Sequence, residues 1–316
     1  MKDMLRLKHI GVLIFILHAR SLICLMHIFP VKDTKLLKFI CLNSGRCGQV
    51  PKLGLFTKLY RNYPWQQAVR DACDLGYDAL EWMGRSPHLN LNKTAEIHEI
   101  KQMVKQNGLS ICAIALYECK EMTTKGWTTE EIDKFKRVLE IASYWECHLL
   151  RFGPSKPSPQ EARDEHWYRA TEVMQQACEL ALSYGIEIGL EMHAGYLIES
   201  PEAVIRLIRL INLPNVGIVF DPANLICAGL DYKEDVILKI APYLRHVHIK
   251  DIKHTISGFQ HQLLGQGDLD LKAVLRGLLM IEYEGTITVE SHVAGDPRYI
   301  AEHERKVLLH TWEELV

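Results

Sequence analysis

From Lys52 onward, segments with the pattern of β-strands alternate with helical segments eight times. The expected strands cover 53–57, 78–83, 110–117, 148–153, 186–193, 216–221, 244–250 and 286–292. Eight such units over 265 residues match the size of a closed (βα)8 barrel. An open doubly wound sheet is the alternative, but it usually has a glycine-rich phosphate turn after its first strand, and 55–64 (LFTKLYRNYP) has none. We therefore expect a single-domain α/β TIM barrel at 52–316.

Helix-boundary residues support these units. Gly76 closes an expected helix at 65–75, and Thr128 with the acidic pair Glu130 and Glu131 opens another at 129–146. Ser200 before Pro201 is an N-cap followed by proline at the first helical position. The other helices are expected at 94–106, 160–184, 232–243, 270–283 and 297–315, with a longer loop after the strand at 244–250.

Residues 1–51 do not share this pattern. Three basic residues (Lys2, Arg6 and Lys8) precede an apolar run at 10–17, as in a signal peptide, but no clean small-x-small cleavage site follows. The run is also too short to cross a bilayer as a helix. A membrane-associating extension, a decayed targeting signal and an upstream start remain open. We favour the upstream start and expect no catalytic chemistry in this extension.

Charge and cysteine usage limit the location and the partners. The formal net charge of −2 gives no global attraction to nucleic acid or anionic lipid, so we expect neither as a partner. The nine cysteines form no CxxC pair, and an odd number without a disulfide framework favours a reducing compartment. We therefore expect a cytoplasmic protein with buried structural thiols.

Four of the later strands end on a residue that can bind a divalent metal. These residues are Glu191, Asp221, His248 and Glu290, at intervals of 30, 27 and 42 residues. The period-two alternation of each strand turns them toward the barrel interior, near the carboxyl-terminal ends where barrel enzymes keep their active sites. Any one of them alone is as easily a cap, a surface charge or a core histidine. Four at matching depth predict a metal site.

Three carboxylates and one imidazole form a hard, oxygen-rich ligand set. Mn²⁺ is the expected ion, with Mg²⁺, Co²⁺ or Zn²⁺ as alternatives. Four protein ligands leave positions for two substrate oxygens, such as the carbonyl and neighbouring hydroxyl of a sugar. The ion then stabilises an enediolate, while one carboxylate removes a C–H proton and another returns it.

The motifs DLGYDALEW, IGLEMH, VFDPAN, HVHIKD, GQGDLD and YEGTITVE occur in this order between residues 74 and 290. On these motifs the chain resembles the xylose isomerase-like TIM barrels, specifically their sugar phosphate isomerase/epimerase branch. The resemblance implies that Glu191, Asp221, His248 and Glu290 hold the metal and that Glu191 and Glu290 are the acid/base pair. It also implies that the chain can pair as a homodimer.

Two positions depart from this family's pattern. Many relatives have Asp-x-x-His after the sixth strand, whereas here Asn224 follows Asp221 and cannot serve as a base. The glutamate that ketose 3-epimerases place six residues past the first ligand is Leu197 here. These departures count against a mechanism that needs either residue.

Further pocket residues are expected around the metal. The predicted substrate-binding residues are His193, Asn224, Lys250, Glu81 and Arg151. Packing or salt bridges are the alternatives, and for Arg151 the expected partners are Glu191 and Glu81. Asp251 can orient a neighbour, His292 can face the pocket, and Gly265, Gly267 and Asp268 are expected to shape the loop over the site.

The leading function is a metal-dependent isomerase or epimerase of a small sugar, sugar phosphate or sugar acid. The alternative on the same scaffold is a dehydratase of the inosose type, in which the enediolate expels a β-hydroxyl. A more distant alternative is an abasic-site endonuclease-like hydrolase, which expects a trinuclear zinc site with more histidines and a basic groove. The first half of the chain offers no histidine at a strand mouth.

Overall fold

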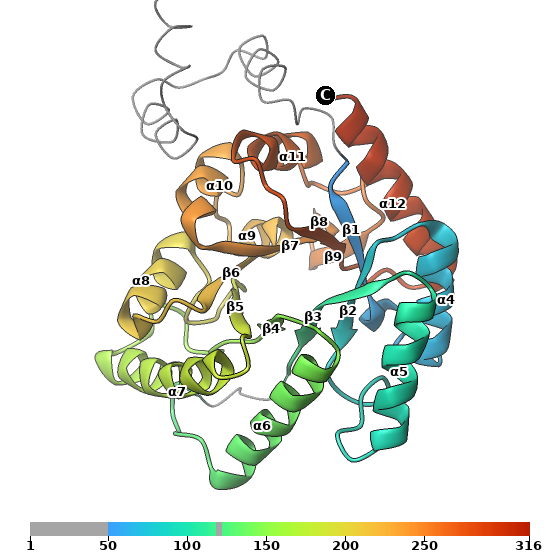
Figure 1. The fold of residues 1–316 in the computed structure, drawn as a ribbon. Helices are drawn as coiled ribbons and strands as arrows, with labels where there is room; N and C mark the ends of the chain where they lie inside the picture. The colour runs from blue at the N-terminus through green and yellow to red at the C-terminus, as the bar shows by residue number, and fades with distance from the viewer. Residues whose placement is uncertain (1–49, 118–121) are drawn as a thin grey trace, which may run out of the picture. The chain divides into compact units, whose positions relative to one another are not determined.

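A computed structural model describes residues 50–117 and 122–316, and Val50–Leu315 form one compact unit. Its parallel strands close into a barrel in the order β1-β10-β7-β6-β5-β4-β3-β2. Figure 1 shows the major helices arranged around these strands. The predicted TIM barrel is therefore confirmed. That residues 52–316 form the catalytic domain stays a prediction, and the expectations for 1–49 lie outside the described residues.

The barrel strands are short and follow the predicted positions closely. They are β1 (Lys52–Phe56), β2 (Ala79–Met83), β3 (Ser110–Ala115), β4 (Leu149–Arg151), β5 (Glu187–Glu191), β6 (Val216–Phe220), β7 (Leu244–Ile249) and β10 (Thr286–Val289). The barrel closes where β10 pairs with both β1 and β7, with Gly54 opposite Thr288 and Thr288 opposite His248. A Cβ at Gly54 would lie 2.4 Å from the Thr288 hydroxyl, so this close approach requires glycine.

The helices begin and end at the signals seen in the sequence. They are α4 (Trp65–Leu75), α5 (Thr94–Gln106), α6 (Thr129–Tyr144), α7 (Asp164–Leu182), α8 (Pro201–Ile211), α9 (Pro222–Cys227), α10 (Glu234–Ile240), α11 (Leu271–Met280) and α12 (Pro297–Glu313), with 3₁₀ turns η2 (Thr57–Tyr60) and η3 (Ala241–Tyr243). Thr128 and Glu131 form a capping box at α6. Gly76 ends α4 with φ 77°, a left-handed conformation that favours glycine.

The two faces of the strands divide the interior as the alternation predicts. Apolar residues such as Leu55, Leu80, Ile188 and Leu190 are fully buried in the main core cluster with the helices. Polar residues of the other faces fill the barrel itself. At its mouth, Phe56 forms a smaller apolar cluster with Met83, Ala115 and Tyr117.

Three local predictions differ from the structure. The loop expected after β7 contains an antiparallel hairpin, β8 (Asp251–Thr255) and β9 (Gly258–Gln262). The helix predicted at 232–243 is shorter, because Pro242 lacks an N–H and the chain tightens into η3. Asp221 does not end a strand but caps the short helix α9, whose Pro222 stands at the first helical position.

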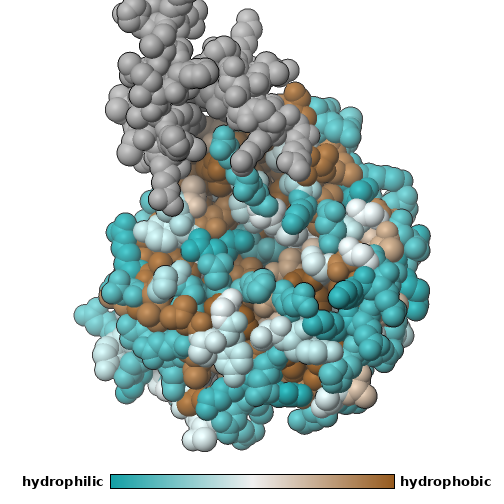
Figure 2. All heavy atoms as spheres, viewed as in Figure 1, coloured by the Kyte–Doolittle hydropathy of each residue, from teal (hydrophilic) through white to brown (hydrophobic). Residues whose placement is uncertain are grey.

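Figure 2 shows hydrophilic residues over most of the face in view, with hydrophobic residues in smaller areas between them. Within 50–117 and 122–316, none of the helices is both long enough and apolar enough to cross a membrane.

Candidate metal centre

The four residues predicted as metal ligands converge at one point. One ligand atom from each of Glu191, Asp221, His248 and Glu290 lies within 4.8 Å of the other three. They lie near the carboxyl ends of β5, β6, β7 and β10, with Asp221 and Glu290 each one residue beyond the strand, and these strands are neighbours around the barrel. Asp221, His248 and Glu290 are buried and Glu191 is nearly so. The close parallel pairing of these strands brings residues separated by up to 99 positions together.

Asp221 is held in place through both of its carboxylate oxygens. Its Oδ1 accepts the backbone N–H groups of Ala223 and Asn224, at 3.0 and 3.2 Å, at the N-terminus of α9. Its buried Oδ2 has no aligned hydrogen-bond donor in the part of the chain that the structure describes. The Lys250 ammonium lies 2.5 Å from Oδ2 as an ion pair. A carboxylate oxygen in this state is suited to a cation.

His248 presents its two ring nitrogens to different groups. Nδ1 lies 3.1 Å from Glu191 Oε1 and 3.4 Å from Glu290 Oε2. Nε2 lies 2.5 Å from Glu81 Oε2, on the opposite side of the ring. The Phe56 ring stacks on the imidazole at 6.0 Å between centroids. This arrangement leaves Nδ1 as the nitrogen that faces the other predicted ligands.

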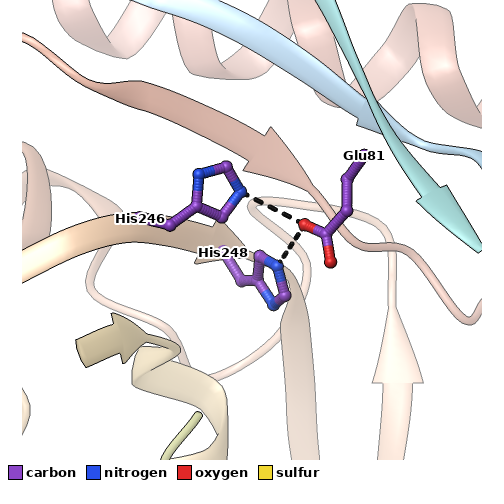
Figure 3. Close-up of side chains that lie close together, drawn as sticks. All are labelled: Glu81, His246 and His248. Carbon is purple, nitrogen blue, oxygen red and sulfur yellow. Dashed lines mark hydrogen bonds and ion pairs between the residues drawn. The ribbon is translucent and has the colours of Figure 1, made fainter. Parts of the chain in front are cut away.

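Glu81 lies beneath the four-residue group, with no exposed surface. Its Oε2 contacts Nε2 of both His246, at 3.1 Å, and His248, as Figure 3 shows. Its Oε1 accepts from Arg151 Nε at 3.0 Å, and Arg151 Nη1 also donates to Glu191. The Arg151 partners proposed from the sequence are therefore both present. Glu81 and Arg151 link β2, β4, β5 and β7 across the barrel interior.

Glu81, His246 and His248 also have the composition of a metal site. Their separations favour hydrogen bonding instead. Two ligands of one ion at about 2.1 Å with octahedral or tetrahedral angles lie roughly 3 Å or more apart, whereas Glu81 Oε2 and His248 Nε2 are 2.5 Å apart. The Arg151 guanidinium already supplies positive charge to this carboxylate. We interpret the trio as a hydrogen-bonded support for His248.

The buried charges shift one another's pKa values. Although burial opposes it, Arg151 and the His248 hydrogen bond lower the pKa of Glu191 to about 2. Burial is likewise outweighed at Glu290, where Lys250 and His248 hold the pKa well below its usual range. Burial raises the pKa of Asp221, with Lys250 opposing it. Glu191 and Glu290 are therefore ionised at neutral pH, as a metal ligand or a base must be.

Lys250 lies between the carboxylates of Asp221 and Glu290. Its Nζ lies 2.8 Å from Glu290 Oε2 as well as close to Asp221, and it is buried. Despite burial, these two acids raise its pKa above its ordinary value. The structure therefore places Lys250, as it does Arg151, against the predicted ligands.

The side chains of His193 and Asn224 have their polar contacts outside the four-residue group, although the Asn224 backbone N–H donates to Asp221 Oδ1. His193 is exposed, with its ring stacked on Tyr196 at 4.4 Å and Nδ1 3.1 Å from its neighbour's carbonyl. Asn224 is buried and donates its amide to the Met192 carbonyl at 3.0 Å. Leu197 is fully buried in the core and provides no pocket side chain.

Of the remaining candidates, one contacts a predicted metal ligand and the others order the hairpin and the segment after it. His292 lies 3.3 Å from Glu290 Oε1 at the barrel mouth. Asp251 accepts the backbone N–H groups of Ile252, Gly265, Gly267 and Leu269, so it orders the segment after the hairpin. Asp268 accepts from His254 N in the hairpin.

Two residues at the mouth were missed from the sequence. Lys58, on the turn after β1, lies 3.3 Å from Glu290 Oε1, and Tyr117 follows β3. Burial lowers the pKa of Lys58, while Glu290 opposes this shift. The available signal was position, since both residues stand two places beyond a barrel strand, where active-site residues gather.

The residues present fit a divalent ion. The donor set has three carboxylates and one imidazole nitrogen, and the buried Asp221 Oδ2, which already faces the Lys250 ammonium, is suited to positive charge. An ion that binds oxygen at about 2.1 Å holds opposite ligand atoms about 4.2 Å apart, so ligand atoms within 4.8 Å need little movement.

Comparison with known proteins identifies the family of the chain. The family model for the xylose isomerase-like TIM barrel matches residues 69–310. A fructoselysine 3-epimerase of Escherichia coli is 26% identical over 252 residues, which cover 76% of this chain and 90% of the relative. An inosose dehydratase of Geobacillus kaustophilus is 25% identical over 235 residues, which cover 72% of this chain and 73% of the relative.

Solved structures share the fold at lower identity. A D-allulose 3-epimerase of a Methylomonas species has a TM-score of 0.67 at 17% identity, covering 83% of this chain and 98% of that one. A probable 3-DHS dehydratase of Bacillus anthracis has a TM-score of 0.72 at 18% identity, covering 82% and 98%. With a family model that spans most of the barrel, this chain belongs to the xylose isomerase-like TIM barrel family of enzymes.

Proposed function

We propose that this protein is a divalent-metal-dependent epimerase or isomerase of a small sugar or sugar derivative. The observation that carries this proposal is that carboxylate oxygens of both Glu191 and Glu290 lie close to His248 Nδ1, at 3.1 and 3.4 Å. Two ionised glutamates beside one cation site can act on two faces of one carbon. The 3-epimerase relative supports a carbohydrate substrate.

Glu191, Asp221, His248 and Glu290 would hold the ion, with Mn²⁺ as the expected metal. When bound, it would supply Lewis acidity to the carbonyl and hydroxyl oxygens of the sugar. Glu191 and Glu290 are the proposed acid/base pair. In one direction, a carboxylate oxygen of the first glutamate takes the proton from the carbon beside the carbonyl, and the C–H electron pair moves into an enediolate. The second glutamate then delivers a proton to the opposite face of that carbon.

Neighbouring side chains hold these glutamates in place. Arg151 donates to Glu191 and Lys250 donates to Glu290, each from a buried position. The two cations keep the carboxylates ionised until they accept a proton. Contacts of Arg151, Lys250, His193 or Asn224 with substrate stay predictions, as does homodimer formation.

A dehydratase is the second candidate function, and the inosose dehydratase relative supports it. The first step is the same deprotonation. The enediolate then breaks the C–O bond to a β-hydroxyl, which leaves with a proton as water. An abasic-site endonuclease-like hydrolase has less support, because within 50–117 and 122–316 the groups with metal-site composition are the two described above.

Deuterium exchange tests the proposal directly. The full chain, loaded with Mn²⁺, is incubated in D₂O with ketoses, inososes and their phosphates, and the products are followed by NMR. We expect metal-dependent deuterium uptake at one carbon, reduced at least about 100-fold in Glu290→Gln because a general acid/base group is removed. Glu302→Gln, at a half-buried position on α12, is the control and should exchange at the wild-type rate.

Loss of water from an inosose would assign the dehydratase function. Exchange that persists without divalent metal, or that survives Glu290→Gln unchanged, would contradict both functions.

A further inference from the structure

We propose that the barrel mouth contains an anion-binding subsite formed by Lys58, Tyr117 and Arg85, and that the sugar substrate carries a permanent negative charge, as a carboxylate or a phosphate. This inference rests on the proposed sugar chemistry and narrows its substrate class.

Lys58 differs from the other cations of the site in its exposure. Its side chain is 20% exposed, whereas those of Arg151 and Lys250 are each 8% exposed. Its ammonium lies 3.3 Å from Glu290 Oε1 and 3.4 Å from His292 Nε2. It therefore reaches the predicted reaction centre from the solvent side, where a substrate would enter.

When the charges of the site residues and the ion are summed, the positive charge of Lys58 is left over. Four carboxylates lie in or directly beneath the site, from Glu81, Glu191, Asp221 and Glu290. Arg151 pairs with the first two, and Lys250 pairs with the last two. A divalent ion with a neutral histidine ligand adds two positive charges, which balance the set. Lys58 is then one positive charge beyond balance.

The reaction itself cannot use this excess. When a proton moves from the sugar carbon to Glu191 or Glu290, the enediolate gains one negative charge and the glutamate loses one. The total charge of site and substrate is unchanged, because the proton stays within the site. An excess cation at the mouth therefore suits a substrate that brings a negative charge with it.

Two further groups stand beside Lys58 at the mouth. The Tyr117 ring lies 5.8 Å from Lys58 Nζ and 4.0 Å from the guanidinium carbon of the exposed Arg85. The buried Tyr117 hydroxyl has no hydrogen-bond partner among the described residues. A buried hydroxyl without a partner is uncommon. The buried Arg151 guanidinium also lies 5.8 Å from this ring. Three cations and an available hydroxyl around one ring form a suitable set of donors for an anion.

Binding and exchange together test the subsite on the full, Mn²⁺-loaded chain. Calorimetry compares sorbitol with sorbitol 6-phosphate and with gluconate, none of which has the carbonyl needed for exchange. Exchange in D₂O compares fructose with fructose 6-phosphate and with fructuronate. The two anions distinguish a phosphate site from a carboxylate site.

We expect the wild type to prefer one anion over its neutral parent, and Lys58→Gln to weaken binding of that anion roughly 10- to 100-fold. In Lys58→Gln the ratio of kcat/KM for the anionic sugar to kcat/KM for fructose should fall at least about tenfold, because only the anionic sugar makes the charge-assisted contact. Lys58→Arg should restore the preference, and the exposed Lys306→Gln should behave as wild type.

An equal loss for neutral and anionic sugars in Lys58→Gln would overturn the inference, because Lys58 would then act only through Glu290. Wild-type binding that shows no preference for either anion would overturn it as well. A lack of exchange with every ketose would instead count against the proposed reaction, while the calorimetric preference would still decide the subsite.

Discussion

Glu81 approaches His248 from the side of the imidazole opposite the predicted metal ligands. A metal-bound histidine usually donates its other ring N–H to a carboxylate, which fixes the tautomer and the ring orientation. The Nε2 to Oε2 distance of 2.5 Å and the full burial of Glu81 match this relation. We therefore propose that Glu81 positions His248 and does not touch substrate, although its sequence position predicted a substrate contact.

Replacing this carboxylate should weaken metal binding. Glu81→Gln keeps the size of the side chain but removes the charge that orients His248. We expect the dissociation constant for Mn²⁺, measured by calorimetry, to rise about 10- to 100-fold. Glu302→Gln, at a half-buried position on α12, is the matched control. Urea unfolding verifies that the variant is folded, and unchanged affinity in a folded Glu81→Gln protein would refute this role.

At the scale of elements, the hairpin β8–β9 and the segment after it depend on Asp251. Its Oδ2 accepts from Gly265 and Gly267, both at 2.9 Å, and Oδ1 accepts from Ile252 and Leu269. A Cβ at Gly267 would lie 2.1 Å from Asp251 Oδ1, so this packing requires glycine. One buried carboxylate thus orders the connection between β7 and α11.

Asp251→Asn should destabilise this connection. The new NH₂ group cannot accept a hydrogen bond and would face backbone donors. We expect the free energy of unfolding in urea to fall by about 2 to 4 kcal/mol, the usual range for hydrogen bonds lost from a buried charged acceptor. Asp231→Asn is the control, because Asp231 caps two backbone N–H groups in an exposed turn. Equal small losses in both variants would contradict the anchoring role.

At the scale of the whole molecule, the C-terminal helix closes the ring of helices around the barrel and buries the carboxyl group of Glu304. The C-terminal helix α12 contacts both α11 and α4, and Tyr77 donates to the Ala301 carbonyl at 2.7 Å. On this helix Glu304 is 2% exposed and accepts from Leu264 N at 2.9 Å. Burial raises the pKa of Glu304 to about 7, against the opposing hydrogen bonds of Leu264 and Ser291.

This raised pKa predicts a pH dependence of stability. The folded state binds the proton more tightly than the unfolded state, so the stabilisation is complete below the ordinary value of 4.5 and is lost as pH rises to about 7. The shift corresponds to roughly 3 kcal/mol. We expect Glu304→Gln, which resembles the protonated form, to match wild type near pH 4.5 and to gain about that much relative stability near pH 7.5.

Urea unfolding in the presence of a chelator measures both proteins at each pH, so that metal binding does not contribute. Glu302→Gln serves as the control, because Glu302 lies on the same helix as Glu304 and is less buried. Parallel pH profiles for wild type and Glu304→Gln would rule out this group as the source.

The sequence by itself determined the barrel and the four residues at its mouth. Period-two strands and capped helices are local signals, and parallel strands place their carboxyl ends on one face, so Glu191, Asp221, His248 and Glu290 could be grouped in advance. The hairpin also had a local signal, the Ser257-Gly258 turn between two strand-like runs, which was overlooked.

Only the tertiary structure decided which residues lie beneath the four predicted ligands and which lie above them at the barrel mouth. Glu81 meets His246 across the barrel interior from a strand that is not its neighbour, at a separation of 165 residues. Lys58 meets Glu290 at a separation of 232, because β1 pairs with β10 when the ring closes. Such contacts follow from the curvature of the closed sheet and from side-chain length, and neither leaves a periodic pattern in the chain.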